Sequence, residues 1–348
     1  MNPGRRASPH RVPSTGGRAG GTTIVLVPVP PFDLDLSASI FAGGDPQIRS
    51  YTEGAFRQVL RVDGRLVLVT VSSEGSVERP KVRVGVLPGP FPAGVLKAAG
   101  KAVTSLFNLD LDLSRFTAAV REDRVMSNLV RRLRGLKPPR TATVFEALVD
   151  SIIEQQISLA AAHSIEKRVI RSFGDLLPLE GVHYYAFPSP RRLADATPEE
   201  LRACGLSLKK AEYILGISRE IREGALDLEN HGPREETGII IRGLSTLRGV
   251  GVWTAELAVL RGLSRMDALP ADDLGIRRAI SRYYSRETRI DGEEARRIAG
   301  AWGNWRGLAA YYLLVAEQKG IGIPDPEIGS RSMGSAIAGI RAPSNIHK

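Results

Sequence analysis

The chain has 348 residues, enough for two or three domains with cores of their own, and its apolar content of 43% is ordinary for a soluble globular protein. No apolar run is long enough to cross a bilayer, while a single cysteine, Cys204, and five scattered histidines exclude an internal disulfide and give no metal-ligand spacing. The net charge of +10 favours a polyanionic partner such as nucleic acid, so we expect a soluble protein without membrane, metal or cofactor.

Both ends of the chain lack the patterns of folded structure. Residues 1–22 contain four arginines and no acid among many Gly, Pro and Ser residues, so they cannot bury enough apolar surface to fold alone. An organellar presequence, a DNA-binding arm and a misassigned start remain open for this basic tail. Residues 321–348 carry Gly, Ser, Ile and Arg without a period, and we expect a mobile tail there as well.

Short runs with high β propensity, separated by turn-forming residues, follow the first tail. They predict a small antiparallel sheet in an amino-terminal domain of residues 23–113, to which we assign a packing role. Asp63 and Gly64 favour a two-residue hairpin turn between two of these runs. The expected strands are Thr23–Val27, Gln58–Val62, Arg65–Ser72 and Val82–Leu87.

A basic run introduces the second part of the chain, residues 114–320, which we expect to be helical. Such a run is either a solvated face or a rim that contacts phosphates. Pro138 and Pro139, near the end of the run, mark the entry to the next domain. The basic residues are Arg115, Arg121, Arg124, Arg131, Arg132, Arg134, Lys137 and Arg140.

The region from Val144 to Phe173 has the most regular helical spacing in the chain, and we expect one long helix. Three polar residues, Gln155, Gln156 and Ser158, interrupt its apolar stripe. Because buried polar groups need partners, these side chains either form hydrogen bonds in the core or face a polar ligand such as DNA.

Further helices are predicted on both sides of residue 240. Thr197, with Pro and Glu after it, begins one helix, and Leu206 to Arg222 forms another, whose lysines we expect to be solvated. The last helix runs from Gly307 to Ala316. The tryptophans before it, Trp302 and Trp305, are either core anchors or the wall of a pocket, and we expect Cys204 to be buried.

The segment Gly249-Val250-Gly251 lies between two runs with helical spacing, Ile239 to Leu247 and Thr254 to Leu263, and predicts a helix-hairpin-helix. Both glycines can take backbone angles closed to other residues, which would let amide N–H groups converge at the start of the second helix and bind a phosphate. An ordinary helix end followed by a turn is the alternative. A dinucleotide motif is disfavoured because Thr254 stands at the position of its third glycine.

An acidic pair, Asp272 and Asp273, follows the hairpin. Pro270 ends the preceding segment, and an aspartate then opens a helix with an apolar stripe. An acid at a helix start is often only a cap, so the pair alone does not establish a chemical role. The residues of the stripe are Leu274, Ile276, Ile280 and Tyr283.

The hairpin Gly249–Ala255 and the loop Pro270–Leu274 together resemble the helix-hairpin-helix DNA glycosylase superfamily, and most closely its 3-methyladenine DNA glycosylase II branch. The resemblance covers roughly residues 23–320 and is strongest from Val144 to Leu314. It implies a mainly α fold with a small α+β amino-terminal domain. It also implies an intracellular base-excision-repair enzyme, expected to be a monomer, that acts on double-stranded DNA containing damaged bases.

The resemblance also assigns roles to residues. Asp273 matches the aspartate that assists removal of a flipped base, so it is the candidate catalytic residue. Gly249, Gly251 and Thr254 match positions that bind the DNA backbone. Gln156 matches the wedge that fills the gap left by the flipped base, although an apolar residue often stands there in relatives.

Trp253 occupies the position of the lysine that bifunctional relatives use to cut the strand, which implies a monofunctional enzyme that leaves an abasic site. Trp253 either stacks on the flipped base or packs its helix, and Leu257 replaces an aromatic residue of some relatives. Alkylated purines are the favoured substrates. An oxidised or deaminated base, or a non-catalytic DNA-binding role, are the alternatives.

Overall fold

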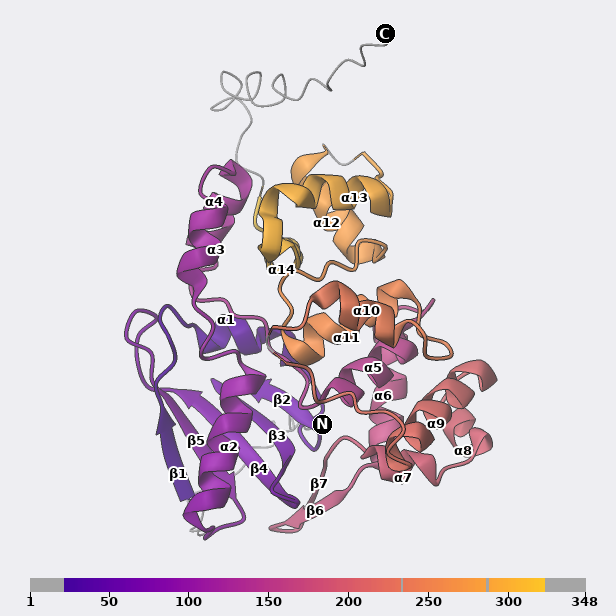
Figure 1. The fold of residues 1–348 in the computed structure, drawn as a ribbon. Coiled ribbons are helices and arrows are strands. Elements are labelled where there is room, and N and C mark those ends of the chain that lie inside the picture. Colours follow the sequence, from indigo (N-terminus) through magenta and orange to yellow (C-terminus); the bar gives the residue numbers. More distant parts are fainter. Residues whose placement is uncertain (1–21, 233, 286–287, 323–348) are drawn as a thin grey trace, which may run out of the picture.

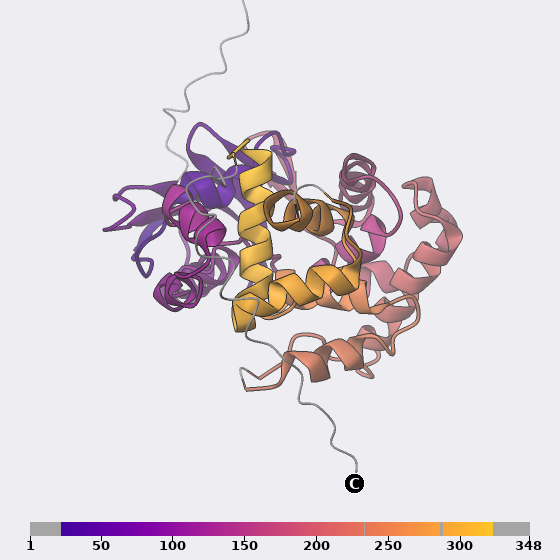
Figure 2. The same ribbon diagram turned by 90° about the horizontal axis from the view of Figure 1, so that it is seen from above.

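The computed structural model describes residues 22–232, 234–285 and 288–322. The two predicted tails, 1–22 and 321–348, therefore lie almost entirely outside the described residues. Figure 1 shows a sheet with one long helix across it, joined to a larger body of helices. Figure 2, turned by 90°, shows the sheet at one side and the helices of residues 150–230 at the other. The fold is mainly α with a small antiparallel sheet, as predicted.

The amino-terminal sheet has five antiparallel strands in the order β1-β5-β4-β3-β2. Its predicted hairpin is confirmed, since Val62 pairs with Arg65 and both turn residues, Asp63 and Gly64, have positive φ. The edge strand β2 was not predicted, because its sequence Arg-Ser-Tyr-Thr has no apolar alternation. The strands are β1 (Thr22–Leu26), β2 (Arg49–Thr52), β3 (Ala55–Val62), β4 (Arg65–Ser73) and β5 (Val82–Leu87), and a separate hairpin is formed by β6 (Leu176–Leu179) and β7 (Val182–Tyr185).

Fourteen α-helices and two short 3-10 helices are present in the described residues. They are α1 (Leu34–Ala38), η1 (Ser39–Phe41), α2 (Ala93–Leu106), α3 (Leu113–Ala119), α4 (Arg124–Arg132), α5 (Val144–Glu154), α6 (Leu159–Phe173), α7 (Pro190–Ala194), α8 (Pro198–Ala203), α9 (Leu208–Arg222), α10 (Thr237–Leu244), α11 (Val252–Leu263), α12 (Leu274–Tyr284), α13 (Gly292–Ala299), η2 (Gly300–Trp305) and α14 (Arg306–Gln318). None of the helices in the described part of the chain combines the length and apolarity required to span a bilayer.

Three large hydrophobic cores hold these elements together, and a fourth, smaller cluster of Val59, Leu68, Leu177 and Ala186 packs the sheet against the β6–β7 hairpin. One lies between the sheet and α2, a second gathers α5, α6, α9, α10 and α11, and a third gathers α3, α4, α12, α13 and α14. Trp302 anchors the third core as predicted, because its ring is buried and its Nε1 donates to Asp123 at 3.0 Å. Trp305 is half-buried beside Phe116, and Cys204 is buried as expected.

The single long helix predicted from Val144 to Phe173 is wrong. The chain forms two helices, α5 and α6, separated by residues 155–158. Gln156 has φ +57°, which no α-helix interior allows, and the Ser158 hydroxyl caps α6 by accepting from Ala161 N at 3.3 Å. The three polar residues in the apolar stripe therefore mark a turn between two helices.

The basic run of residues 115–140 is not one uniform face. Six of its arginines are exposed, but Lys137 is fully buried and its Nζ donates to Val29 O at 2.9 Å and to Leu109 O at 3.0 Å. Burial lowers the pKa of Lys137 to about 8. Arg140 also turns inward and donates to Gly262 O. The last two basic residues thus fasten the segment between the sheet and the helical body.

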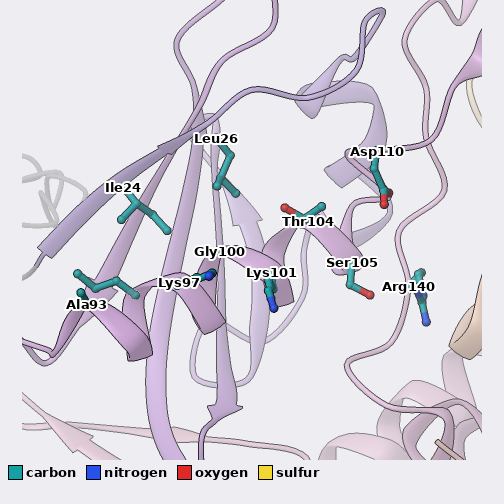
Figure 3. A pocket seen from close by; sticks show the side chains of 11 residues that line it. Ile24, Leu26, Ala93, Lys97, Gly100, Lys101, Thr104, Ser105, Asp110 and Arg140 are labelled. Carbon is teal, nitrogen blue, oxygen red and sulfur yellow. The ribbon is translucent and has the colours of Figure 1, made fainter. Parts of the chain in front are cut away.

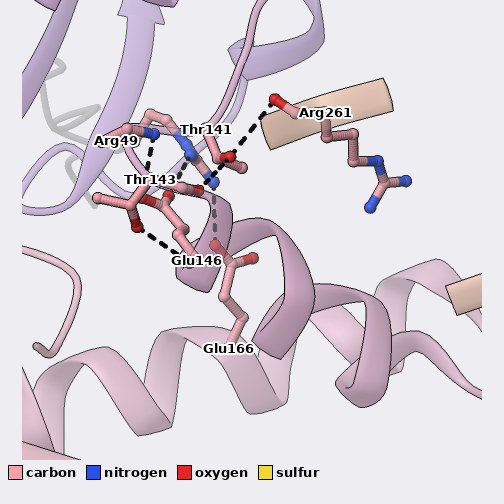
Figure 4. A network of polar contacts seen from close by, with 7 residues as sticks. Arg49, Thr141, Thr143, Glu146, Glu166 and Arg261 are labelled. Carbon is pink, nitrogen blue, oxygen red and sulfur yellow. Dashed lines mark hydrogen bonds and ion pairs between the residues drawn. The ribbon is translucent and has the colours of Figure 1, made fainter. Parts of the chain in front are cut away.

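A buried ion-pair network joins the edge of the sheet to α5 and α6 (Figure 4). Arg49 on β2 contacts Glu146 on α5 at 3.1 Å and Glu166 on α6 at 2.9 Å. Thr143 caps α5 by accepting from Glu146 N at 3.0 Å, which fixes the helix start beside the sheet. One guanidinium therefore connects three elements that are far apart in the sequence.

Candidate functional site

The predicted helix-hairpin-helix is formed by α10 and α11, which Figure 1 shows beside α5. Gly249 has φ +87°, and a Cβ there would lie 2.1 Å from the Tyr213 ring, so only glycine fits. Gly251 does not take the backbone angles closed to other residues that we expected, because its φ of −87° and ψ of 173° are open to any residue. Space is nevertheless open where its Cβ would be, so another molecule can approach the start of α11 closely.

The hairpin turn is tied to the break between α5 and α6 by Gln155. Its Nε2 donates to Gly249 O at 2.9 Å and to Thr254 Oγ1 at 3.0 Å. Thr254 is 2% exposed, so its hydroxyl serves this internal contact. A ligand outside the hairpin can reach Thr254 only through the backbone N–H groups of the first turn of α11, which have no partner within the helix.

Lys210 on α9 holds the same break from the other side. Its Nζ donates to Ile153 O at 2.8 Å and to Gln155 O at 2.7 Å, and so satisfies carbonyls at the end of α5. Partial burial lowers its pKa. The expectation of solvated lysines is therefore wrong for Lys210 and holds for its exposed neighbour Lys209. No local pattern distinguishes the two.

The candidate wedge, Gln156, is exposed at the tip of this break. Its left-handed backbone turns the chain between α5 and α6, and Lys210 and Gln155 support the tip from below. The next apolar residues, Ile157 and Leu159, are also exposed, at 38% and 58%. A protruding tip on a fixed base is a suitable shape for a residue that enters the stack of a duplex.

Asp273 is the N-cap of α12, and its Oδ1 accepts from Ile276 N at 3.0 Å. The side chain is half-buried, whereas its neighbour Asp272 is 63% exposed. Arg261 on α11 lies within electrostatic reach. Burial alone would lower the pKa of Arg261, but Glu154, which contacts it at 2.7 Å, raises that pKa together with Asp150 and Asp273.

Trp253 occupies the first turn of α11 and is half-buried. Its Nε1 is buried and has no hydrogen-bond partner among the described residues, an unusual position for an indole N–H. Leu257, one turn later, is 4% exposed and faces the protein interior. The ring of Trp253 is therefore placed at the start of the hairpin's second helix with a polar atom that a ligand could satisfy.

A cavity of about 650 Å³ lies elsewhere, between β1 and α2 (Figure 3). Its walls include the apolar side chains of Ile24 and Leu26 and the basic side chains of Lys97, Lys101 and Arg140. None of the predicted site residues lines it. The hairpin, the tip at Gln156 and Asp273 therefore lie outside this cavity, which is a separate feature of the molecule.

The chain is similar to known proteins over most of its helical part. The sequence profile of the HhH-GPD superfamily base excision DNA repair proteins matches residues 149–304. DNA-3-methyladenine glycosylase of Bacillus subtilis (strain 168) is 32% identical over 218 residues, which cover 61% of this chain and 70% of that protein. DNA-3-methyladenine glycosylase 2 of Escherichia coli (strain K12) is 32% identical over 183 residues, 53% of this chain and 61% of that protein.

A solved structure extends the similarity to the sheet. The 3-methyladenine DNA-glycosylase from Archaeoglobus fulgidus superimposes with a TM-score of 0.74 at 27% identity, covering 86% of this chain and all of that chain. The matched residues 149–304 include the hairpin, Asp273 and the tip at Gln156. By sequence and by fold, the chain belongs to the HhH-GPD superfamily of base excision DNA repair proteins.

Proposed function

We propose that this protein is a monofunctional DNA glycosylase that removes alkylated purines from duplex DNA and leaves an abasic site. The observation that carries the proposal is the half-exposed carboxylate of Asp273, fixed by its cap bond at the end of the loop that follows the hairpin. The names of the Bacillus subtilis, Escherichia coli and Archaeoglobus fulgidus relatives support 3-methyladenine as a member of the substrate class.

The chemistry requires a carboxylate and little else. The bond between C1′ and the base nitrogen breaks with its electron pair on the base, and the sugar becomes oxocarbenium-like. Asp273, as the anion, stabilises that positive charge and orients a water whose oxygen bonds to C1′ while its proton passes to the carboxylate or to solvent. Because an alkylated purine already carries positive charge, it leaves as a neutral base without further protonation.

The DNA grip follows from the start of α11 and from the tip between α5 and α6. Free backbone N–H groups after Gly251 suit a phosphate, and the open space there lets the sugar–phosphate backbone approach. Gln156 is exposed on its supported tip, where it would fill the gap left by an extruded nucleotide. Trp253, with its unpartnered N–H, would contact the flipped base.

The absence of an amine at the first turn of α11 supports a monofunctional reaction. A strand-cutting glycosylase needs a nucleophilic amine to form a Schiff base with C1′. The indole of Trp253 cannot do so. We therefore expect the strand to remain intact until alkali is added. Strand cleavage without added alkali would contradict this part of the proposal.

The test compares Asp273→Asn with its neighbour, Asp272→Asn, on duplexes that each carry one lesion. We expect Asp273→Asn to lower the single-turnover rate of base release by at least about 10²-fold, as for loss of a group that stabilises developing charge, while duplex affinity is kept. Asp272→Asn, a change at an exposed carboxylate beside the site, should cost much less. Equal release by Asp273→Asn and wild type would overturn the assignment of Asp273 as the catalytic residue, whereas no release by the wild type from any lesion would favour a non-catalytic DNA-binding role.

The choice of lesion decides between substrate classes. Duplexes with 3-methyladenine, with an oxidised purine and with a deaminated base should be compared at the same enzyme concentration. Release of the methylated base alone, or at least about 10²-fold faster than the others, is expected because a cationic base leaves readily. Faster release of the oxidised or deaminated base would replace alkylated purines in the proposal.

A further inference from the structure

We propose that Arg296 is a positioning residue that holds the loop before Asp273 in place for base release, an inference that rests on the proposed function. Arg296 lies on α13, outside the hairpin and outside α12. Its guanidinium contacts Glu256 on α11 through two hydrogen bonds, of 2.7 and 3.1 Å. The same guanidinium donates to Leu269 O at 3.0 Å. One side chain therefore joins the DNA-gripping helix to the main chain of the loop that ends in Asp273.

The partner of Arg296 is built into the protein interior. Glu256 is 5% exposed, in the second turn of α11, where Trp253 and Thr254 occupy the first. A buried carboxylate needs a charged partner, and the two-pronged contact with an arginine is the geometry that satisfies it best. Nη1 donates both to Glu256 Oε1 and to Leu269 O, so Glu256 fixes the nitrogen that contacts the loop.

The start of α13 also contacts the loop next to Asp273. A Cβ at Gly292 would lie 2.1 Å from Asp272 Oδ1, so the Asp272 side chain rests on the backbone of this helix. The Arg296 Nη2 lies 3.6 Å from Asp272 Oδ2. Helix α13 thus contacts the loop at Leu269 and at Asp272, immediately before the candidate catalytic residue.

The beginning of the loop is held differently, by main-chain bonds. Gly307 N donates to Met266 O at 2.8 Å, and Arg265 N donates to Val259 O at 3.2 Å. The end of the loop has main-chain bonds only within itself, from Ala271 N to Leu269 O at 2.7 Å and from Asp273 N to Pro270 O at 2.9 Å. Leu269 and Ala271 are also buried in the third core, and Arg296 adds a charged side-chain contact to α11 and α13. Because a displacement of about 1 Å at a catalytic group can lower a rate about 10²-fold, loss of this contact should act on catalysis more than on DNA binding.

Three variants separate positioning from folding. Arg296→Met removes the contacts with Glu256, Leu269 O and Asp272 and leaves Glu256 buried without this partner. We therefore expect a lower melting temperature and a single-turnover rate reduced about 10- to 100-fold. Glu256→Gln keeps the donation to Leu269 O and should lower the rate less than about threefold. The double variant Arg296→Met/Glu256→Gln removes the unpaired charge, so its melting temperature should recover while its rate stays low.

Two further variants complete the set. Arg296→Lys, which keeps one charged donor, should restore part of the rate lost in Arg296→Met. Arg297→Met is the matched control, because Arg297 is the next residue on α13, is 71% exposed and pairs only with Glu294 of its own helix among the described residues. Its rate should equal that of wild type. Affinity for a duplex with an abasic site should stay within about twofold in all five variants.

The outcomes distinguish the inference from the function on which it rests. Recovery of both melting temperature and rate in the double variant would show that Arg296 only stabilises the fold, and would overturn the inference while Asp273→Asn remained inactive. Base release by Asp273→Asn at the wild-type rate would overturn the catalytic role of Asp273 and the inference with it, and no release by the wild type from any lesion would overturn the proposed function itself. Loss of rate in Arg297→Met equal to that in Arg296→Met would also contradict a specific role for Arg296.

Discussion

Arg49 and Arg296 each join elements that are distant in the chain, but the charges around them differ. Arg49 faces two carboxylates, the buried Glu146 and the partly buried Glu166, at the boundary between the sheet and the helices (Figure 4). Arg296 faces one buried carboxylate, Glu256, together with the exposed Asp272 and the backbone carbonyl of Leu269. The first arrangement is an ion-pair network that connects two parts of the fold, and the second connects a helix to a loop. An arginine therefore stabilises the fold in the first region, and in the second, we propose, an arginine sustains the rate of base release.

The Arg49 network contains more acid than base. Glu146, Asp150 and Glu154 follow one another at spacings of four residues on α5, so they share a face of the helix. Asp150 is 9% exposed and its Oδ1 has no hydrogen-bond partner among the described residues. Burial raises the pKa of Asp150 well above its usual value, and the nearby carboxylates of Glu166 and Glu146 raise it further. The network therefore stabilises the interface and contains one buried carboxyl group, that of Asp150, whose pKa is raised.

The largest expected effect is that of Arg49→Met, which removes the cation of the network between the sheet and the helices. Removing the cation leaves Glu146 and Glu166 with uncompensated charge, and breaking a buried pair in this way costs about 3 to 5 kcal/mol of the free energy of unfolding. The midpoint of urea unfolding measures the loss. The single-turnover rate of the folded fraction should remain close to wild type, in contrast to Arg296→Met.

Arg57→Met is the matched control for that prediction. Arg57 lies on the neighbouring strand β3, opposite Ser50, and is exposed. Its replacement should change the free energy of unfolding by less than about 0.5 kcal/mol. An equal loss in both variants would mean that the sheet edge is generally sensitive and that the network has no special role.

Asp150→Asn tests the buried carboxyl group in the same network. We expect a smaller change in the free energy of unfolding than for Arg49→Met, and of opposite sign. The folded protein holds the Asp150 proton more tightly than the unfolded chain, whose carboxyl titrates near 3.8. This group's contribution to stability is therefore greatest below that pH and is lost as the pH rises through the raised folded pKa. Asparagine has no such dependence, so at pH 8 the variant should be more stable than wild type by about 1 to 2 kcal/mol.

The pH series provides the check on that prediction. The difference between Asp150→Asn and wild type should shrink toward zero as the pH falls to about 4, because both side chains are then neutral. The other charged groups that face Asp150, namely Glu146 and Glu154 on its own helix, Arg49 on β2, Glu166 on α6 and Arg261 on α11, are present in both proteins. A difference independent of pH would show that Asp150 is ionised throughout the range.

Local signals in the sequence predicted much of this fold. Asp63-Gly64 specified a turn because both positions need positive φ, and Thr197 with Glu200 specified a helix start because the pair forms a capping box. The positive φ of Gly249 and the cap at Asp273 were likewise readable from neighbours in the chain. The close approach of Tyr213 to Gly249 was not. Each of these features depends on residues within a few positions of one another.

Contacts between distant segments could not be predicted in the same way. Lys210 and Lys209 are equivalent in the sequence, yet only the first reaches the end of α5. Arg296 and Arg297 are likewise adjacent, and only the first meets Glu256, forty residues earlier. The acidic spacing on α5 was visible in the sequence, but its meaning depends on Arg49, which a strand without apolar alternation brings to that face.

The smallest effect is expected where the two regions meet, at Arg261. Its Nη1 contacts Glu154 at 2.7 Å, and its pKa is raised by Glu154 and Asp150 on one side and by Asp273 on the other. Glu154→Gln removes one charge from a partly exposed pair, so the free energy of unfolding should fall by about 0.5 to 1 kcal/mol. The positive charge of Arg261 would then be less compensated near Asp273, where we propose that the sugar becomes cationic. We therefore expect base release to slow about two- to fivefold at low salt and to recover as salt screens the charge. A variant that loses stability without any salt-dependent change in rate would show that the network on α5 ends at Glu154 and does not influence Asp273.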